Sequence, residues 1–174
     1  AVVEGRTDGQ ELLSEPLDAF ATRLEALGYG PFRLWWKQTV AELRRQDSTL
    51  SPVSTCVLSA ALVEGALTFI VKHGRSLGAF GSSDFDGTPQ RWKLEDLVKS
   101  ACSGGNASIL DQSAKNRVDV LIKTRQRIHA GRMLADYPGG AADLRPEESR
   151  DAKATADIVV RRILDWLQRN PPGT

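Results

Sequence analysis

Apolar residues recur every three or four positions along most of this 174-residue chain, which is the period of an amphipathic helix. Proline near the start of a segment, and glycine or proline at its end, mark where such helices begin and stop. No segment shows the period of two that indicates a strand. The pattern therefore predicts an all-α fold, a largely antiparallel helical bundle of about six helices. The predicted helices span about 14–27, 31–45, 52–73, 88–103, 107–134 and 146–169.

The segment from Pro52 to His73 is apolar almost all the way round, so it is predicted to be the central buried helix. Its only carboxylate is Glu64. That carboxylate either pairs with a buried base or orients Arg125 or His129. Small residues in the same segment let neighbouring helices approach closely: Ala60, Ala61, Gly65 and Ala66.

The length is that of one domain with a substantial core. Residues 1–13 are polar and lack a clear period, so they are predicted to be a flexible lead. Residues 14–170 are then a single helical domain. Gly-rich residues 74–88 are predicted to form the clearest loop, and residues 136–145 a turn-rich break before the last helix.

The predicted helix 107–134 carries an unusual change along its buried face. At about 100° per residue, Arg125 and then His129 continue the apolar stripe. An unpaired buried guanidinium costs several kcal/mol, so two interpretations follow. Either Arg125 pairs with a core carboxylate such as Glu64 and His129 is a satisfied core histidine, or the helix end opens onto a cleft or interface. The apolar stripe consists of Ala114, Val118, Leu121 and Ile122.

Charge adds a second feature to the same segment. The whole chain has a net charge of only +1, whereas residues 107–134 contain six basic residues and two acidic ones. This local excess can attract phosphates, or it can be a solvated face paired with neighbouring acids. The basic residues are Lys115, Arg117, Lys123, Arg125, Arg127 and Arg132.

The string Arg125-Gln126-Arg127-Ile128-His129 resembles the signature of the HEPN superfamily of small helical domains. Their mark is an Arg followed by a polar residue and, a little later on the same helix, a His. The Glu64-bearing helix and the final helix are similar too, so the HEPN-like core spans about 52–169. The resemblance implies a metal-independent endoribonuclease without a cofactor, a toxin or anti-phage defence effector whose site forms at a dimer interface.

In this interpretation RNA supplies its own nucleophile, the 2′-hydroxyl. Arg125 would hold the scissile phosphate, and His129 would be the general acid or base. The supporting residues would be Gln126 and Glu64. The RNA-binding residues would be Lys123, Arg127 and Arg132.

Two other interpretations stay open. Only three residues separate Arg125 from His129, and Gln126 follows the Arg, which departs from the usual family pattern. These departures favour a catalytically inactive HEPN domain that binds nucleic acid, nucleotides or a protein. The third interpretation is a plain helical adaptor, with Arg125 and Glu64 as a core ion pair. Expected partners are RNA, a second copy of the chain, and an antitoxin or a nucleotidyltransferase.

Cys56 and Cys102 are far apart and show neither metal-ligand spacing nor a disulfide pattern. A reducing, cytoplasmic location is therefore expected. No apolar run of membrane-spanning length and no signal peptide is recognised, so no membrane partner is expected.

Overall fold

The computed structural model describes residues 15–77, 88–103, 108–136, 139 and 143–171, without the side chains of residues 132 and 133. Within these ranges the chain forms seven α-helices and one 3-10 turn, and no strand. The predicted all-α bundle is confirmed, with one more helix than expected. The elements are α1 (Pro16–Ala26), α2 (Gly30–Arg45), α3 (Pro52–Ser76), η2 (Pro89–Arg91), α4 (Leu94–Cys102), α5 (Gln112–Ile128), α6 (Ala130–Asp136) and α7 (Pro146–Arg169).

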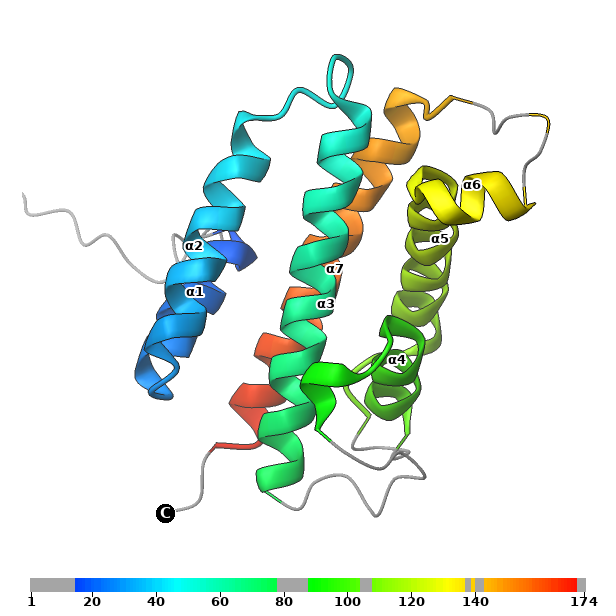
Figure 1. The fold of residues 1–174 in the computed structure, drawn as a ribbon. Helices are drawn as coiled ribbons and strands as arrows, with labels where there is room; N and C mark the ends of the chain where they lie inside the picture. The colour runs from blue at the N-terminus through cyan, green and yellow to red at the C-terminus, as the bar shows by residue number, and fades with distance from the viewer. Residues whose placement is uncertain (1–14, 78–87, 104–107, 137–138, 140–142, 172–174) are drawn as a thin grey trace, which may run out of the picture.

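Helices α3 and α7 form the centre of the bundle and pack along each other (Figure 1). The α1–α2 pair lies on one side of them, and α4 and α5 lie on the other. The predicted flexible lead, residues 1–13, lies outside the described residues, as do residues 78–87 of the predicted loop. The core holds large side chains from every side of the bundle, among them Phe20, Trp36, Leu62, Leu67, Ile163 and Trp166.

Helix α3 is the central buried helix that its apolar sequence predicts, although it continues three residues past His73 to Ser76. It is also the one helix in the described residues that is long and apolar enough to cross a membrane, with a mean hydropathy of 1.8. The expectation that no apolar run reaches this length is therefore wrong. In the bundle 56% of that apolar stretch is buried, because α3 packs against helices on several sides. The core helix of a bundle thus meets the same criteria as a membrane span.

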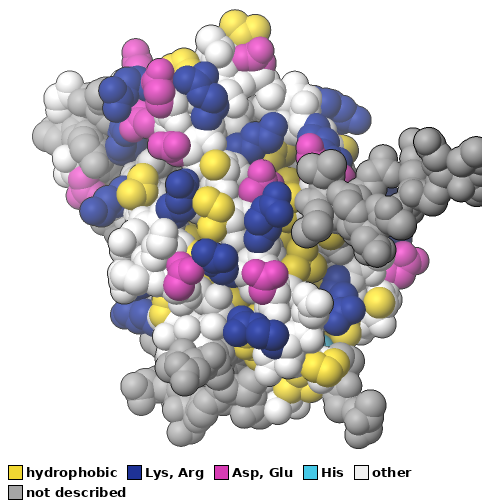
Figure 2. All heavy atoms as spheres, turned by 180° about the vertical axis from the view of Figure 1, so that it is seen from behind, with side chains coloured by type: hydrophobic (Ala, Val, Ile, Leu, Met, Phe, Trp, Pro, Cys, Tyr) yellow, Lys and Arg dark blue, Asp and Glu magenta, His cyan; other side chains and the backbone are white. Residues whose placement is uncertain are grey.

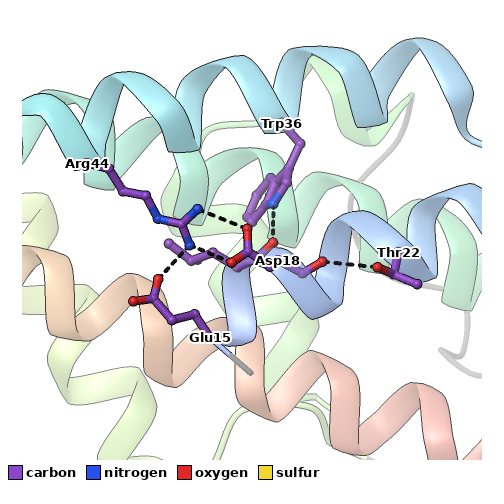
Figure 3. Close-up of polar contacts among 6 residues, drawn as sticks. Glu15, Asp18, Thr22, Trp36 and Arg44 are labelled. Atoms are coloured by element: carbon purple, nitrogen blue, oxygen red, sulfur yellow. Dashed lines mark hydrogen bonds and ion pairs between the residues drawn. The ribbon is translucent and has the colours of Figure 1, made fainter. Parts of the chain in front are cut away.

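The α1–α2 pair is held by a buried hydrogen bond and by a surface ion cluster (Figure 3). The Trp36 Nε1–H donates to the Leu17 carbonyl at 2.8 Å. Arg44 donates to Asp18 at 2.7 Å and contacts Glu15 at 2.5 Å. The exposed ion pairs contribute little, typically about 0–1 kcal/mol each. The buried indole, which packs edge-on to the Phe20 ring at 4.5 Å, carries most of the stabilisation.

The two predicted helices that precede the last one are both divided. In place of a helix from residue 88, a 3-10 turn comes first and α4 begins only at Leu94. In place of one helix over 107–134, α5 begins after Asp111, whose carboxylate accepts from the Ala114 N–H at 2.8 Å. It ends at Ile128, and α6 follows at a new angle. Helical periodicity continues across such a break, so the sequence pattern did not reveal it.

Candidate functional site

An open cleft of about 370 Å³ lies between α3, the start of α4 and the end of α5. It contains four of the residues that the sequence singled out. Arg125 and Gln126 come from the last turn of α5, His129 from the α5–α6 junction, and Glu64 from the middle of α3. The remaining lining residues are Lys93, Leu94, Glu95 and Ile122.

Arg125 pairs with Glu64, as one of the two interpretations expected. The Nη1 of Arg125 donates to the Glu64 carboxylate at 2.6 Å. This pair is not in the core, because the two side chains are 49% and 38% exposed. The last turn of α5 faces the cleft where its earlier turns face neighbouring helices, so the guanidinium reaches both its partner and solvent.

His129 is not the core histidine of that interpretation. Its side chain is exposed, and its backbone is extended (φ −82°, ψ 116°), so it ends α5 as the C-cap. The prediction that His129 lies one helical turn beyond Arg125 on the same helix is therefore wrong. The imidazole lies over Gly131, where an added Cβ would be 3.4 Å from Cε1. Among the described residues the ring makes no hydrogen bond, which leaves both ring nitrogens available to a ligand.

Two of the three expected RNA-binding bases, Arg127 and Lys123, are not among the residues that line this cleft. Arg127 points to α7, where it pairs with Glu148 and donates to the Asp143 carbonyl at 3.5 Å. Lys123 is exposed but does not line the cleft, and the side chain of Arg132 lies outside the described residues. Among the five basic residues of the segment whose side chains are described, three pair with carboxylates, as Lys115–Asp119, Arg125–Glu64 and Arg127–Glu148.

Lys93 and Glu95 are the charged lining residues that the sequence did not single out. Lys93 is the N-cap of α4, and Glu95 lies in its first turn. An acidic residue in the first turn indicates a helix start, because a negative charge is favourable near the positive N-terminal end of the helix dipole. Nothing in the spacing shows that this helix start faces the Glu64 and Arg125 side chains, since roughly 30 residues separate the segments.

The formal charges of the described lining residues cancel, because Lys93 and Arg125 are matched by Glu64 and Glu95. A phosphate that entered the cleft would therefore be held by directed hydrogen-bond donors and not by a strongly positive field. The face of the molecule seen in Figure 2, from behind the view of Figure 1, also mixes basic and acidic side chains. The described residues contain no group of three or more His, Cys, Asp or Glu side chains arranged to hold a metal ion.

The second histidine lies elsewhere. His73 is only 6% exposed, and burial lowers its pKa, with the nearby Arg23 charge adding to the effect. Its ring stacks on Phe69 with centroids 5.6 Å apart. It is therefore a packed, neutral ring, and His129 is the accessible imidazole of the described chain.

The cleft thus offers a guanidinium, an amide, an imidazole and two carboxylates to a ligand from solvent. The guanidinium and the amide are groups that can bind a phosphate, and the imidazole and the carboxylates are groups that can transfer protons. In comparisons with known proteins, no family model, no curated protein and no solved structure matches the chain.

Proposed function

We propose that this chain is a metal-independent endoribonuclease of the HEPN type, acting in the cytoplasm as a toxin or anti-phage effector. One observation carries the proposal: Arg125, Gln126, His129 and Glu64 line the same solvent-open cleft. The resemblance of the Arg125–His129 string to the HEPN signature supplies the reaction. The broken helix does not weaken this, because the C-cap position gives the His129 ring access to solvent.

The reaction needs a phosphate clamp and proton transfer. Arg125 holds the scissile phosphate through two N–H groups, and Glu64 keeps the guanidinium in the cleft. The RNA 2′-oxygen attacks phosphorus while its proton passes to a base. The bond from phosphorus to the 5′-oxygen breaks, and that oxygen receives a proton. The products are a 2′,3′-cyclic phosphate and a free 5′-hydroxyl, and His129 carries out one of the two proton transfers.

The second proton transfer requires another group. One source is Glu95, whose carboxylate lines the same cleft. The other is His129 of a second copy across a two-fold axis. Exposed Val53 and Val57 support a homodimer, because they lie about three and two turns before Glu64 on the same stripe of α3. A second copy that covers these valines would approach the cleft.

The test is incubation of labelled single-stranded RNA with the purified protein in excess EDTA. Wild type is expected to cleave it and to leave cyclic phosphate ends. His129→Ala and Arg125→Ala should lose about 100-fold or more in rate. Lys123→Ala is the matched control, since this base lies on α5 outside the cleft. A Glu95→Gln variant with wild-type activity would assign the second proton transfer to the partner copy.

A second function is favoured by the Arg125–Glu64 ion pair. This pair neutralises the guanidinium, as expected in a binding module that does not perform chemistry. Such a module would bind RNA, a nucleotide or a partner protein such as an antitoxin or a nucleotidyltransferase. It predicts RNA affinity that falls with salt, without any cleavage. Intact RNA after prolonged incubation with folded protein would establish this second function in place of the first.

A further inference from the structure

A second pocket, of about 180 Å³, opens between α2, α3 and η2. Its walls are three aromatic rings, those of Tyr29, Phe32 and Phe69. The polar groups of Thr68, Lys72 and Gln90 lie among its lining residues. An aromatic wall with a cation beside it suits a flat ring system that carries negative charge on one side.

The aromatic walls are held in place from behind. Tyr29 meets Phe69 edge-on at 4.8 Å, and Phe69 stacks on the buried His73 ring at 5.6 Å. Phe32 stacks on Trp35 with centroids 5.4 Å apart. The rings therefore lose little additional rotamer freedom when a ligand binds, which keeps the entropy cost of binding low.

Gly65 explains why this pocket exists. A Cβ at this position would lie 2.8 Å from Cζ3 of Trp35 and 3.5 Å from Cζ of Phe32. A glycine inside a helix costs roughly 0.5–1 kcal/mol relative to alanine. Here it lets α2 approach α3 closely and leaves the pocket open beside the helix backbone.

The pocket adjoins the cleft of the proposed ribonuclease site. Gly65 follows Glu64 directly, and the Thr68 hydroxyl donates to the Glu64 carbonyl at 2.7 Å. On the other side, Gln90 of η2 comes shortly before Lys93, which lines the cleft. The rise from Glu64 to Thr68 along α3 is about 6 Å. Neighbouring nucleotides of one RNA strand can therefore reach both the cleft and the pocket.

We infer that this pocket holds one unstacked base of the RNA strand whose phosphate lies against Arg125 and His129. This inference rests on the proposed function and specifies its substrate as single-stranded RNA. Duplex RNA hides its bases in the stack, whereas a single strand can place one on aromatic side chains. Lys72 would contact the adjacent phosphate, and Gln90 would hydrogen-bond to the edge of the base.

The first experiment tests the pocket without cleavage. Adenosine 5′-monophosphate and ribose 5-phosphate are titrated separately into the full chain while backbone amide resonances are followed. The nucleotide is expected to shift the resonances of Thr68, Phe69 and Lys72, and the base-free sugar phosphate is not. Equal effects of both compounds, or no effect of either at millimolar concentration, would overturn the inference.

Thr68→Leu is the blocking variant, because a larger side chain at this half-buried position fills the pocket. Thr22→Leu is its matched control. Thr22 is exposed on α1, and its hydroxyl donates to the carbonyl four residues earlier, as that of Thr68 does. Nucleotide binding should be lost in the first variant and retained in the second. Unchanged binding by folded Thr68→Leu would place the base elsewhere.

A second experiment separates this inference from the proposed function. An RNA with a single abasic position is compared with intact RNA, and the abasic strand is expected to bind wild type about tenfold more weakly. Equal affinity with cleavage intact overturns the base pocket and leaves the ribonuclease standing. Resonance shifts at Thr68 on addition of the nucleotide, without any RNA cleavage, would support the base pocket and overturn the proposed ribonuclease.

Discussion

At the residue scale, Arg125 has two roles that compete. Its ion pair with Glu64 holds the guanidinium at the cleft but also cancels its charge. Both side chains are more than a third exposed, so the pair contributes less than about 1 kcal/mol to folding. In the proposed function, its significance lies in how it positions Arg125 toward the RNA phosphate.

Replacing Glu64 by Gln is expected to separate binding from chemistry. Without the carboxylate the cleft gains one positive charge, so RNA should bind severalfold more tightly at low salt. The guanidinium also loses its orientation, so kcat should fall about tenfold or more. Cleavage and filter-binding assays measure the two effects. Glu25→Gln is the control, since it removes the partner of Arg33 far from the cleft. Unchanged binding and rate would show that Glu64 does not position Arg125.

His73 makes a residue-scale prediction about pH. Burial lowers its pKa in the folded chain, so the folded state binds fewer protons than the unfolded state. Its contribution to stability is therefore present above the unfolded pKa of about 6.5 and is lost as the pH falls toward the folded pKa. His73→Phe should change stability at pH 7.5 by less than about 1.5 kcal/mol and lose less stability between pH 7.5 and 5.

Urea unfolding at the two pH values measures this difference. His129→Gln is the control, because it removes the exposed histidine and leaves His73 in place. It should keep the wild-type pH dependence. A pH dependence in His73→Phe as steep as in wild type would mean that other groups cause it.

At the element scale, the end of α5 is tied to the start of α7. The Glu148 carboxylate accepts from the Arg145 backbone N–H at 2.9 Å and pairs with Arg127. These contacts lie just before the break that exposes His129. The Arg127–Glu148 pair thus attaches the last turn of α5, which carries Arg125, to the start of α7.

Glu148→Gln is expected to destabilise the fold by about 1–2 kcal/mol at pH 7. The Arg145 N–H bond, followed by Arg127, lowers the pKa of Glu148. Its stabilisation is therefore complete above the unfolded pKa of about 4.3 and is lost as the pH falls through the folded pKa. The variant should show a shallower loss of stability in acid.

Thermal or urea unfolding from pH 7 to pH 3 checks this prediction. Glu147→Gln is the neighbouring control, because Glu147 is 65% exposed and contacts only Arg150, at 3.5 Å, among the described ion pairs. That variant should lose less than about 0.5 kcal/mol. Equal losses in the two variants would refute a special role for Glu148.

At the scale of the whole molecule, the proposed homodimer depends on an exposed stripe of α3. A Val57→Glu substitution would bury a charge in that contact, which costs several kcal/mol without a partner. The dimer dissociation constant should rise at least tenfold, and cleavage should fall with it if the second His129 takes part. Light scattering and RNA cleavage at matched concentrations measure both.

Val120→Glu is the matched control for this experiment. Val120 is a similarly exposed valine, at 57% against 49% for Val57, but it lies on α5 and does not line the cleft. It should leave assembly and activity unchanged. A wild-type protein that is active as a monomer would rule out the need for a second copy and leave Glu95 to complete the reaction.

The apolar period of the sequence by itself determined the helical bundle and its central helix. Helices are held by local backbone bonds and by burial of one face, and both leave a repeat of 3.6 residues in the chain. Glu64 could also be singled out, because a lone carboxylate in an apolar segment needs a partner.

Only the tertiary structure decided how those residues are used. It ends α5 at Ile128 and so puts His129 in solvent, it directs Arg127 to Glu148, and it brings Lys93 and Glu95 to the cleft. The period of apolar residues does not show which distant segments come into contact. Helix ends also depend on what the terminal turns pack against. The candidate site is therefore a property of the packed bundle, although its central residues are visible in the sequence.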